Sequence, residues 1–321
     1  MTIETLTTKS ITKAVELLTA GDIVALPTET VYGLAADSYN TTAIDKIYTI
    51  KGRPKFNPLI AHVADLEMAM QHAVFCNKAK ILAEYFWAGP LTLVLPLKKN
   101  SSISSRASAG LSTIALRKPH GVIAEIAQIL NRPLVAPSAN SSGFLSATTA
   151  QAVYNDLGDK LPLILDGGTC DIGLESTIIK IDATGNIYLL RAGGLAIEQI
   201  EQKIQQKLIT LNIAQAIEAP GMLKSHYAPN KIIRMNANEI YNGELLLAFG
   251  KDRAINSENA AYYLNLSPEG NLIEAAYNLF DYLHKLDNLL NNAIIAVEPI
   301  PNYGLGVAIN DRLIRASANK D

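Results

Sequence analysis

The sequence contains few cysteines and no long apolar run. Cys76 and Cys170 are its two cysteines, and neither belongs to a CxxC pair or another metal-ligand spacing. This argues against a disulfide framework and excludes a zinc finger. No stretch of 18 uninterrupted apolar residues occurs, and the first residues, MTIETLTTKS, lack the basic-then-apolar order of a signal peptide. We therefore expect a cytoplasmic protein with no membrane partner.

Excess charge of one sign is also lacking. The 28 Lys and Arg residues nearly balance the 30 Asp and Glu residues, which gives a net charge of −2. A dedicated nucleic-acid binder usually carries a basic surface, so this balance favours small-molecule chemistry and leaves at most weak, local contacts with tRNA. The 321 residues are 49% apolar, which is enough for two domains with substantial cores.

The usual phosphate-binding loop is missing, because no GxxxxGK[ST] sequence occurs. Residues 51–59, KGRPKFNPL, offer another arrangement: Lys51 and Arg53 stand on a segment that Gly52, Pro54 and Pro58 keep out of a helix. Arginine can bind two oxygens of a polyanion at once, and lysine adds a point charge. The segment therefore suits a triphosphate, although an isolated Lys-x-Arg is more typical of a solvated basic turn.

Helical and strand patterns alternate over the first 200 residues, which predicts an α/β fold. Ser10 can cap a helix that Gly21 closes, a second helix begins at Thr41 or Thr42 and ends before the 51–59 segment, and a third spans 196–208. Apolar runs predict strands at 23–26, 59–63, 91–97, 112–116, 134–136, 163–165, 177–181 and 187–190. We expect a twisted mixed sheet flanked by helices, with the functional site in its concave face.

The pattern changes after residue 208. Residues 209–230 contain Pro220, Gly221 and Pro229 with little periodicity, which predicts a linker. Strand patterns at 232–235, 244–249 and 293–297, and an amphipathic helix whose apolar face runs from Leu272 to Leu290, predict a second, smaller α/β domain. The predicted units are a first domain at 1–208, a linker or lid at 209–230 and a C-terminal domain at 231–321.

Five motifs follow one another along the chain: PTETVYGL (27–34), KGRPKFNPL (51–59), APSAN (136–140), GLESTII (173–179) and APGMLKSHYAP (219–229). This ordered set resembles the threonylcarbamoyl-AMP synthase family, the YrdC-like proteins, in its long two-domain form. The resemblance implies a YrdC-like fold and a nucleotidyltransferase that joins L-threonine, bicarbonate and ATP into L-threonylcarbamoyladenylate and releases pyrophosphate. A separate tRNA threonylcarbamoyl-transferase complex would then use this product for the threonylcarbamoyladenosine modification of tRNA.

One set of residues is expected to bind ATP. Lys51 and Arg53 would clamp the phosphates as the catalytic residues, and Asn57 could donate its amide to an oxygen. Ser138 and Asn140 add short polar groups in a Pro-Ser-Ala-Asn turn, although turn formation alone would explain them. The family likeness adds four further nucleotide contacts, which are Thr113, Ser146, Arg191 and Tyr227. Mg²⁺ is expected to arrive with the triphosphate and keep several waters, so we name no protein metal ligand.

A second set is expected to bind L-threonine. Arg117, at the end of the STIALR run, can pair with the carboxylate through two hydrogen bonds. By the family likeness, Thr30, His62 and Ser176 line the amino-acid pocket and Ala136 contributes its backbone. Without that likeness, His62 would be read as a core histidine with one backbone partner. The acids nearest these loops, Glu29 and Glu175, are expected as structural partners of a cation.

The linker composition suggests a lid. A flexible tether would be rich in Gly and Ser, whereas Met222, His226 and Tyr227 lie here between two prolines. We expect the segment to close over the nucleotide about a hinge at Pro220 and Gly221; in the alternative interpretation the aromatic residues only join the two domains.

Two other functions compete with the synthase. The first is a double-stranded RNA- or tRNA-binding module without catalysis, against which the weakly acidic net charge and the crowded ATP and threonine motifs argue. The second is carbamoyl transfer within a hydrogenase-maturation protein. That protein would need acylphosphatase-like and zinc-finger segments, and the cysteine count excludes the zinc finger.

Overall fold

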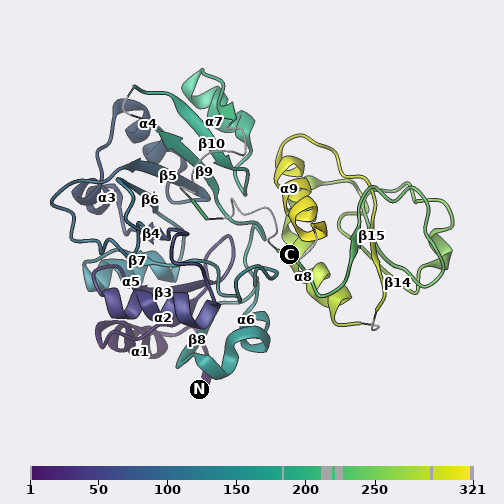
Figure 1. Ribbon diagram of the computed structural model, residues 1–321, viewed down its shortest axis with the longest axis horizontal. Helices are drawn as coiled ribbons and strands as arrows, with labels where there is room; N and C mark the ends of the chain where they lie inside the picture. The colour runs from purple at the N-terminus through teal and green to yellow at the C-terminus, as the bar shows by residue number, and fades with distance from the viewer. Residues whose placement is uncertain (1, 183, 211–218, 221–226, 290–291, 319–321) are drawn as a thin grey trace.

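The structure is a computed structural model that describes residues 2–182, 184–210, 219–220, 227–289 and 292–318. The strands in these ranges form one sheet of eleven strands and another of four. Figure 1 shows the larger, N-terminal part beside the smaller, C-terminal part, with helices α8 (Leu272–Asp287) and α9 (Leu305–Ser317) facing the larger part. The predicted fold class, a mixed α/β sheet flanked by helices with a second α/β domain, is confirmed.

The larger sheet contains β1 (Thr2–Thr5), β2 (Val24–Leu26), β3 (Gly33–Asp37), β4 (Ile60–His62), β5 (Leu91–Pro96), β6 (Thr113–Arg117), β7 (Leu134–Val135), β8 (Leu163–Asp166), β9 (Thr177–Ile181), β10 (Ile187–Arg191) and β11 (Ile209–Thr210). Their order is β1-β8-β2-β3-β7-β4-β6-β5-β9-β10-β11. The sheet is mixed because β4 and β6 run parallel, whereas β5 and β6 run antiparallel. The parallel β4–β6 pair places His62 opposite Arg117.

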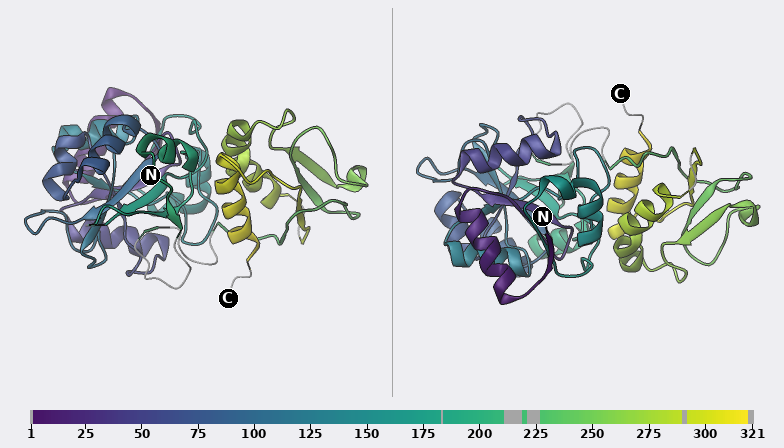
Figure 2. Two further views of the ribbon diagram at one scale, coloured as in Figure 1. Left: turned by 90° about the horizontal axis from the view of Figure 1, so that it is seen from above. Right: turned by 90° about the horizontal axis from the view of Figure 1, so that it is seen from below.

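Helices lie on both sides of this sheet (Figure 2). Their apolar faces are buried in a large core. Those in the described part of the larger domain are α1 (Thr8–Thr19), α2 (Thr41–Lys51), α3 (Leu66–His72), α4 (Asn77–Phe86), α5 (Val122–Leu130), α6 (Ala150–Leu157) and α7 (Ile197–Ile204). Within the described ranges, no helix has both the length and the apolar character needed to cross a membrane.

Helix α1 begins earlier than predicted. Thr7 is the N-cap, and its hydroxyl accepts a hydrogen bond from the Ser10 amide at 3.2 Å. The Ser10 hydroxyl accepts one in return from the Thr7 amide at 2.9 Å, so Ser10 completes a capping box at the third helical position. The prediction of Ser10 as the cap was therefore wrong. Gly21 follows the helix end at a positive φ of 79°, as its predicted closing role requires.

Helix α2 extends further than predicted and includes Lys51. It begins at Thr41, as predicted, and Asn40 caps it by accepting a hydrogen bond from the Ala43 amide. Gly52 ends it in the left-handed conformation, with a φ of 61°. Lys51 was assigned to a loop, and that prediction was wrong. The lysine is fixed at a helix end, and Arg53 begins the loop beyond the glycine.

The predicted end of a third helix was also wrong. Helix α7 ends at Ile204 instead of residue 208, because Gln205 adopts the left-handed conformation with a φ of 52°. Residues 209–210, placed in the linker, form β11 and pair parallel with β10. The sequence analysis also missed β3, which continues directly from the PTETVYGL motif.

The C-terminal part contains β12 (Ile233–Arg234), β13 (Leu245–Ala248), β14 (Tyr262–Asn265) and β15 (Ile295–Val297) in the parallel order β12-β15-β13-β14. Helix α8 begins at Leu272, as predicted, whereas Leu290 of its predicted face lies outside the described residues. The core of this part also takes in Val31, Leu145 and Leu174 from the larger domain. The two domains therefore share buried apolar surface.

Candidate active site

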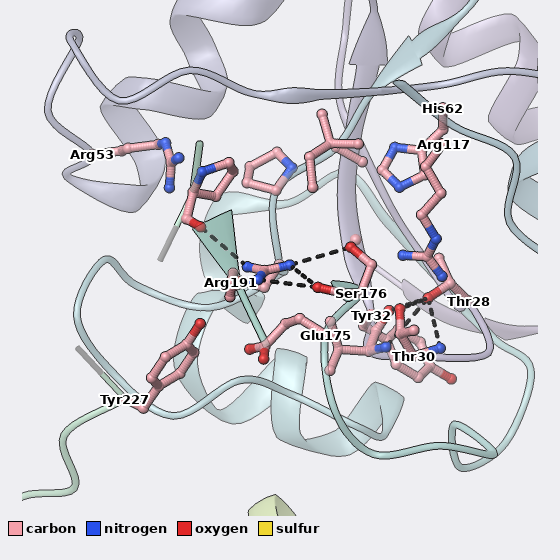
Figure 3. A pocket seen from close by; sticks show the side chains of 17 residues that line it. Thr28, Thr30, Tyr32, Arg53, His62, Arg117, Glu175, Ser176, Arg191 and Tyr227 are labelled. Atoms are coloured by element: carbon pink, nitrogen blue, oxygen red, sulfur yellow. Dashed lines mark hydrogen bonds between the residues drawn. The ribbon is translucent and has the colours of Figure 1, made fainter. Parts of the chain in front are cut away.

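A pocket lies where loops of the larger domain meet the linker (Figure 3). Its lining comes from the loop before β3, from the Arg53 loop, from the regions of β4, β6, β7, β9 and β10, and from linker residues Pro220 and Tyr227. The cavity has a volume of about 40 Å³, which is room for about three water molecules. The pocket is therefore narrow in this conformation, and Pro220 and Tyr227 form part of its lining.

Most of the predicted site residues meet in this pocket. Those that line it are Thr30, Arg53, His62, Arg117, Ala136, Ser138, Ser176, Arg191 and Tyr227. The other five, which do not line it, are Lys51, Asn57, Thr113, Asn140 and Ser146. Motifs up to about 200 residues apart in the sequence thus come together at one place.

Arg53 and Asn57 form one unit at the cationic side of the pocket. Arg53 is 7% exposed, and its Nη2 donates to Asn57 Oδ1 at 2.7 Å and to the Pro58 carbonyl at 2.8 Å. Asn57 is fully buried, and its Nδ2 has no hydrogen-bond partner among the described residues. Asn57 therefore holds Arg53 at the pocket, while its own amide donor lies outside the pocket lining.

Lys51 contacts the backbone of the APSAN turn (136–140). Its ammonium donates to the Ser138 carbonyl at 2.6 Å and also to the Asn140 carbonyl. Burial, together with the neighbouring charge of Arg53, lowers the pKa of Lys51 from 10.5 to about 7. The lysine thus holds the turn that carries Ser138 and can gain or lose a proton near neutral pH.

Arg191 stands at the end of β10 and is held by Ser176. Its Nη2 donates to the Ser176 carbonyl at 2.9 Å and to the Ser176 hydroxyl at 3.2 Å. The Ser176 hydroxyl also lies 2.7 Å from that of Thr92. Burial lowers the pKa of Arg191, and Tyr227 and Glu175 oppose that effect. Figure 3 places its guanidinium between Arg53 and Ser176.

Arg117 and His62 form the other side of the pocket. An Arg117 Nη2 pairs with Glu29 Oε1 at 2.7 Å, and its Nε donates to the Gly89 carbonyl at 3.1 Å. Burial, reinforced by the positive charge of Arg117, lowers the pKa of His62 to about 3, so this imidazole is neutral at physiological pH. His62 Nδ1 has no hydrogen-bond partner within the described ranges. It can therefore accept or donate a bond with a small polar ligand.

Besides Lys51 and Asn57, three predicted residues lie outside the pocket lining. Thr113 begins β6, so it is about 13 Å along the strand from Arg117 at the other end. Asn140 donates its side-chain amide to the carbonyls of Ser141 and Phe144, which shapes the loop. The Ser146 hydroxyl donates to Glu175 Oε1 at 2.5 Å. Ser146 therefore reaches the pocket through Glu175.

Among the pocket residues that sequence reasoning did not name as ligand contacts are Thr28, Pro220 and Glu175. The Thr28 hydroxyl accepts bonds from the amides of Thr30 and Val31 and donates to the Val31 carbonyl at 2.7 Å, which fixes the loop that carries Thr30. Pro220 lines the pocket from the linker. Glu175 was expected only as a structural partner of a cation, yet it also lines the pocket. The PTETVYGL, APGMLKSHYAP and GLESTII motifs contain all three and were the available signal.

The chain matches two family models. One, described as "Telomere recombination", matches residues 16–193. The other, described as "Threonylcarbamoyl-AMP synthase, C-terminal domain", matches residues 195–318. Together they span both parts of the structure.

Curated relatives and solved structures agree with these matches. A threonylcarbamoyl-AMP synthase from Bacillus subtilis (strain 168) is 36% identical, over 97% of this chain and 93% of its own length. One from Pyrococcus abyssi is 37% identical, over 92% of this chain and 91% of its own length. A crystal structure of Pyrococcus abyssi Sua5 complexed with L-threonine superposes with a TM-score of 0.89 at 32% identity and covers 99% of this chain and 98% of that one. The chain belongs to the threonylcarbamoyl-AMP synthase family, in its two-domain form.

Proposed function

We propose that the protein forms L-threonylcarbamoyladenylate and pyrophosphate from L-threonine, bicarbonate and ATP. The observation that carries this function is a pocket with two cationic sides. Arg53 and Arg191 lie on one side, and Arg117 lies with neutral His62 on the other (Figure 3). The first pair suits the phosphates of a nucleotide and Arg117 suits the carboxylate of an amino acid. This arrangement, and relatives named as synthases, favour catalysis over a non-catalytic RNA-binding module.

The chemistry needs orientation and charge neutralisation. The amine of threonine adds to bicarbonate with loss of water and gives a carbamate. A carbamate oxygen then attacks the α-phosphorus of ATP, the bond to the bridging oxygen of the β-phosphate breaks, and pyrophosphate leaves. No covalent enzyme intermediate is required, so the protein contributes by holding reactants together and stabilising the redistributing phosphate charge. Lys51 and Arg53 are proposed for the phosphates, and Arg117, Thr30 and Ser176 for threonine.

Mg²⁺ is proposed to enter with the triphosphate. Within the described residues, no group of three His, Cys, Asp or Glu side chains could hold a metal ion. The carboxylates nearest the pocket, Glu29 and Glu175, are each paired with an arginine. Mg²⁺ commonly keeps several waters and binds through substrate phosphates, which fits a pocket of cations without free acids. The ion would neutralise charge on the leaving pyrophosphate.

The linker is proposed as a lid. Tyr227 is 1% exposed and lines the narrow pocket together with Pro220. ATP therefore requires the linker to shift before it binds, and a closed linker would exclude water from the labile adenylate. Gly221, Met222 and His226, which were assigned to the hinge and lid, lie outside the described residues. The division at residues 208 and 230 stays a prediction.

The protein is further proposed to be a nucleotidyltransferase of the cytoplasm. Its labile product would pass to a separate tRNA threonylcarbamoyl-transferase complex, and direct contact with tRNA would be weak, because the net charge is −2.

The purified protein is expected to release pyrophosphate from ATP only when L-threonine, bicarbonate and Mg²⁺ are all present. A coupled pyrophosphate assay with each component omitted in turn measures this dependence. Equal release without threonine would exclude the proposed reaction.

ATP binding is expected to take up a proton at pH 8. The free protein holds Lys51 mostly neutral there, because its pKa is lowered to about 7. Phosphate charges nearby stabilise the ammonium and raise that pKa again, so the complex binds about one more proton and ATP affinity falls as the pH rises above 7. Calorimetric titrations in two buffers of different ionisation enthalpy measure the uptake. The Lys51→Met variant should lose it; an unchanged uptake would place the proton elsewhere.

A further inference from the structure

The C-terminal domain encloses the loop that carries Glu175 and Ser176. Gly173, just before them, has a φ of +76°, and a Cβ atom there would lie 2.7 Å from the Cα of Tyr277 on α8. Only glycine therefore allows this contact between loop and helix. Leu174 is fully buried in the C-terminal core. One wall of the pocket is thus built against the second domain.

Arg312 of α9 reaches this wall. It is fully buried, and its Nε donates to Glu175 Oε2 at 2.8 Å. Its Nη2 donates to the Ala192 carbonyl at 2.9 Å, and its Nη1 pairs with Asp311 at 2.6 Å. The guanidinium also lies 4.9 Å from the centre of the Tyr227 ring. All three nitrogen atoms of the Arg312 guanidinium therefore have a partner, which fixes the position of the side chain.

Glu175 lies between two arginines with different tasks. Burial alone would raise its pKa, but Arg312 and then Arg191 lower it to about 2, so it stays ionised. Arg191 lines the pocket on the side proposed for the phosphates, and Arg312 does not line it. Figure 3 shows the carboxylate of Glu175 next to Arg191 and on the side of Tyr227. Without Arg312, the nearest remaining cation for Glu175 is Arg191, which is proposed to bind the phosphates of the nucleotide.

We propose that Arg312 is a positioning residue for ATP, which draws the carboxylate of Glu175 away from Arg191 and, through Glu175, holds Ser146. The inference rests on the proposed function, since it takes the Arg191 side of the pocket as the nucleotide site. A second contact supports it: His284 Nε2 of α8 lies 3.0 Å from the Ser146 carbonyl. The C-terminal domain therefore contacts the backbone of Ser146 directly and its hydroxyl through Glu175. It is a structural part of the nucleotide site.

The Arg312→Gln variant tests this role. It leaves Glu175 free to pair with Arg191, so the Kd for ATP should rise at least tenfold, while the Kd for L-threonine should stay within about threefold. Calorimetric titration of the full-length protein measures both constants, and circular dichroism melts verify that the variant is folded. Arg312→Lys keeps the charge without the fork and should fall between the variant and the wild type.

A double variant separates positioning from simple structural damage. Glu175→Gln combined with Arg312→Gln removes both charges, so Arg191 is free again and the ATP Kd should return to within about threefold of the wild-type value. Arg315→Gln is the matched control: Arg315 lies one turn further along α9, pairs with Asp311 at 3.0 Å and does not line the pocket. It should leave the ATP Kd unchanged.

The outcomes distinguish the inference from the function on which it rests. Normal ATP affinity in Arg312→Gln, or a double variant as weak as the single one, would overturn the positioning role alone. Wild-type protein that does not bind ATP in the same titration would overturn the proposed function, and the inference with it.

Discussion

Replacing Lys51 with alanine is expected to lower turnover on the order of 10²-fold, which corresponds to about 2–4 kcal/mol of transition-state stabilisation. The ammonium sits at the end of α2, behind the turn that carries Ser138, and is proposed to act on the phosphates. Its described hydrogen bonds go to the carbonyls of Ser138 and Asn140 and not to the threonine side of the pocket. Threonine affinity should therefore change little. Steady-state pyrophosphate release and calorimetric threonine titration measure the two effects.

Lys55 provides the matched control within the same KGRPKFNPL segment. It is exposed, so Lys55→Ala truncates a lysine of the same segment without touching the pocket and should leave turnover unchanged. If Lys51→Ala instead abolished threonine binding and left turnover at saturating threonine intact, the proposed assignment of the phosphates and threonine to the two sides of the pocket would be wrong.

The Arg117→Ala variant is expected to weaken L-threonine binding by about 100-fold, because it removes a charge-assisted pair with the carboxylate, worth about 1.5–3 kcal/mol. It also leaves Glu29 buried without its cation. Removing one partner of a buried ion pair commonly lowers the free energy of unfolding by about 3–5 kcal/mol. The variant should therefore unfold at lower denaturant concentration as well as bind threonine poorly.

The two effects of this substitution can be separated. Adding Glu29→Gln to Arg117→Ala removes the unpaired buried charge, so stability should recover while threonine affinity does not. Threonine titration and urea unfolding of both variants measure this. An Arg117→Ala protein that binds threonine normally would contradict the proposed carboxylate site.

The sequence predicted the pocket well because its polar residues follow short apolar strands. Arg117 and Arg191 each end a strand of the rigid sheet, and the loop after α2 brings Arg53 to the same pocket. Thr113, which was expected only from the family likeness, begins the strand that Arg117 ends and lies outside the pocket lining. The position of Lys51 was missed because Gly52 permits either a helix end or a loop, and only the backbone conformation decides between them.

The pairing of Glu175 with Arg312 could not be predicted from the sequence. The two residues are 137 positions apart and lie in different domains. Nothing local marks either as buried: Arg312 stands in the pattern NDRLIRAS, which is typical of a solvated helix face, and only packing against Tyr227 and Glu175 makes it fully buried. Long-range charge pairs depend on how two domains dock, and periodicity within a segment carries no such information.

The buried contact between Glu175 and Arg312 also sets an order of events during protein synthesis. Domains generally fold as the ribosome makes them, with the N-terminal one first. Here the larger sheet is complete once β11 has been made, but the wall of its pocket waits for α9, which follows the whole second sheet in the chain. Until that helix leaves the ribosome, Glu175 is a carboxylate without its arginine, beside Arg191. A nascent chain that has completed the larger sheet therefore still lacks the buried partner of Glu175 until α9 has been made.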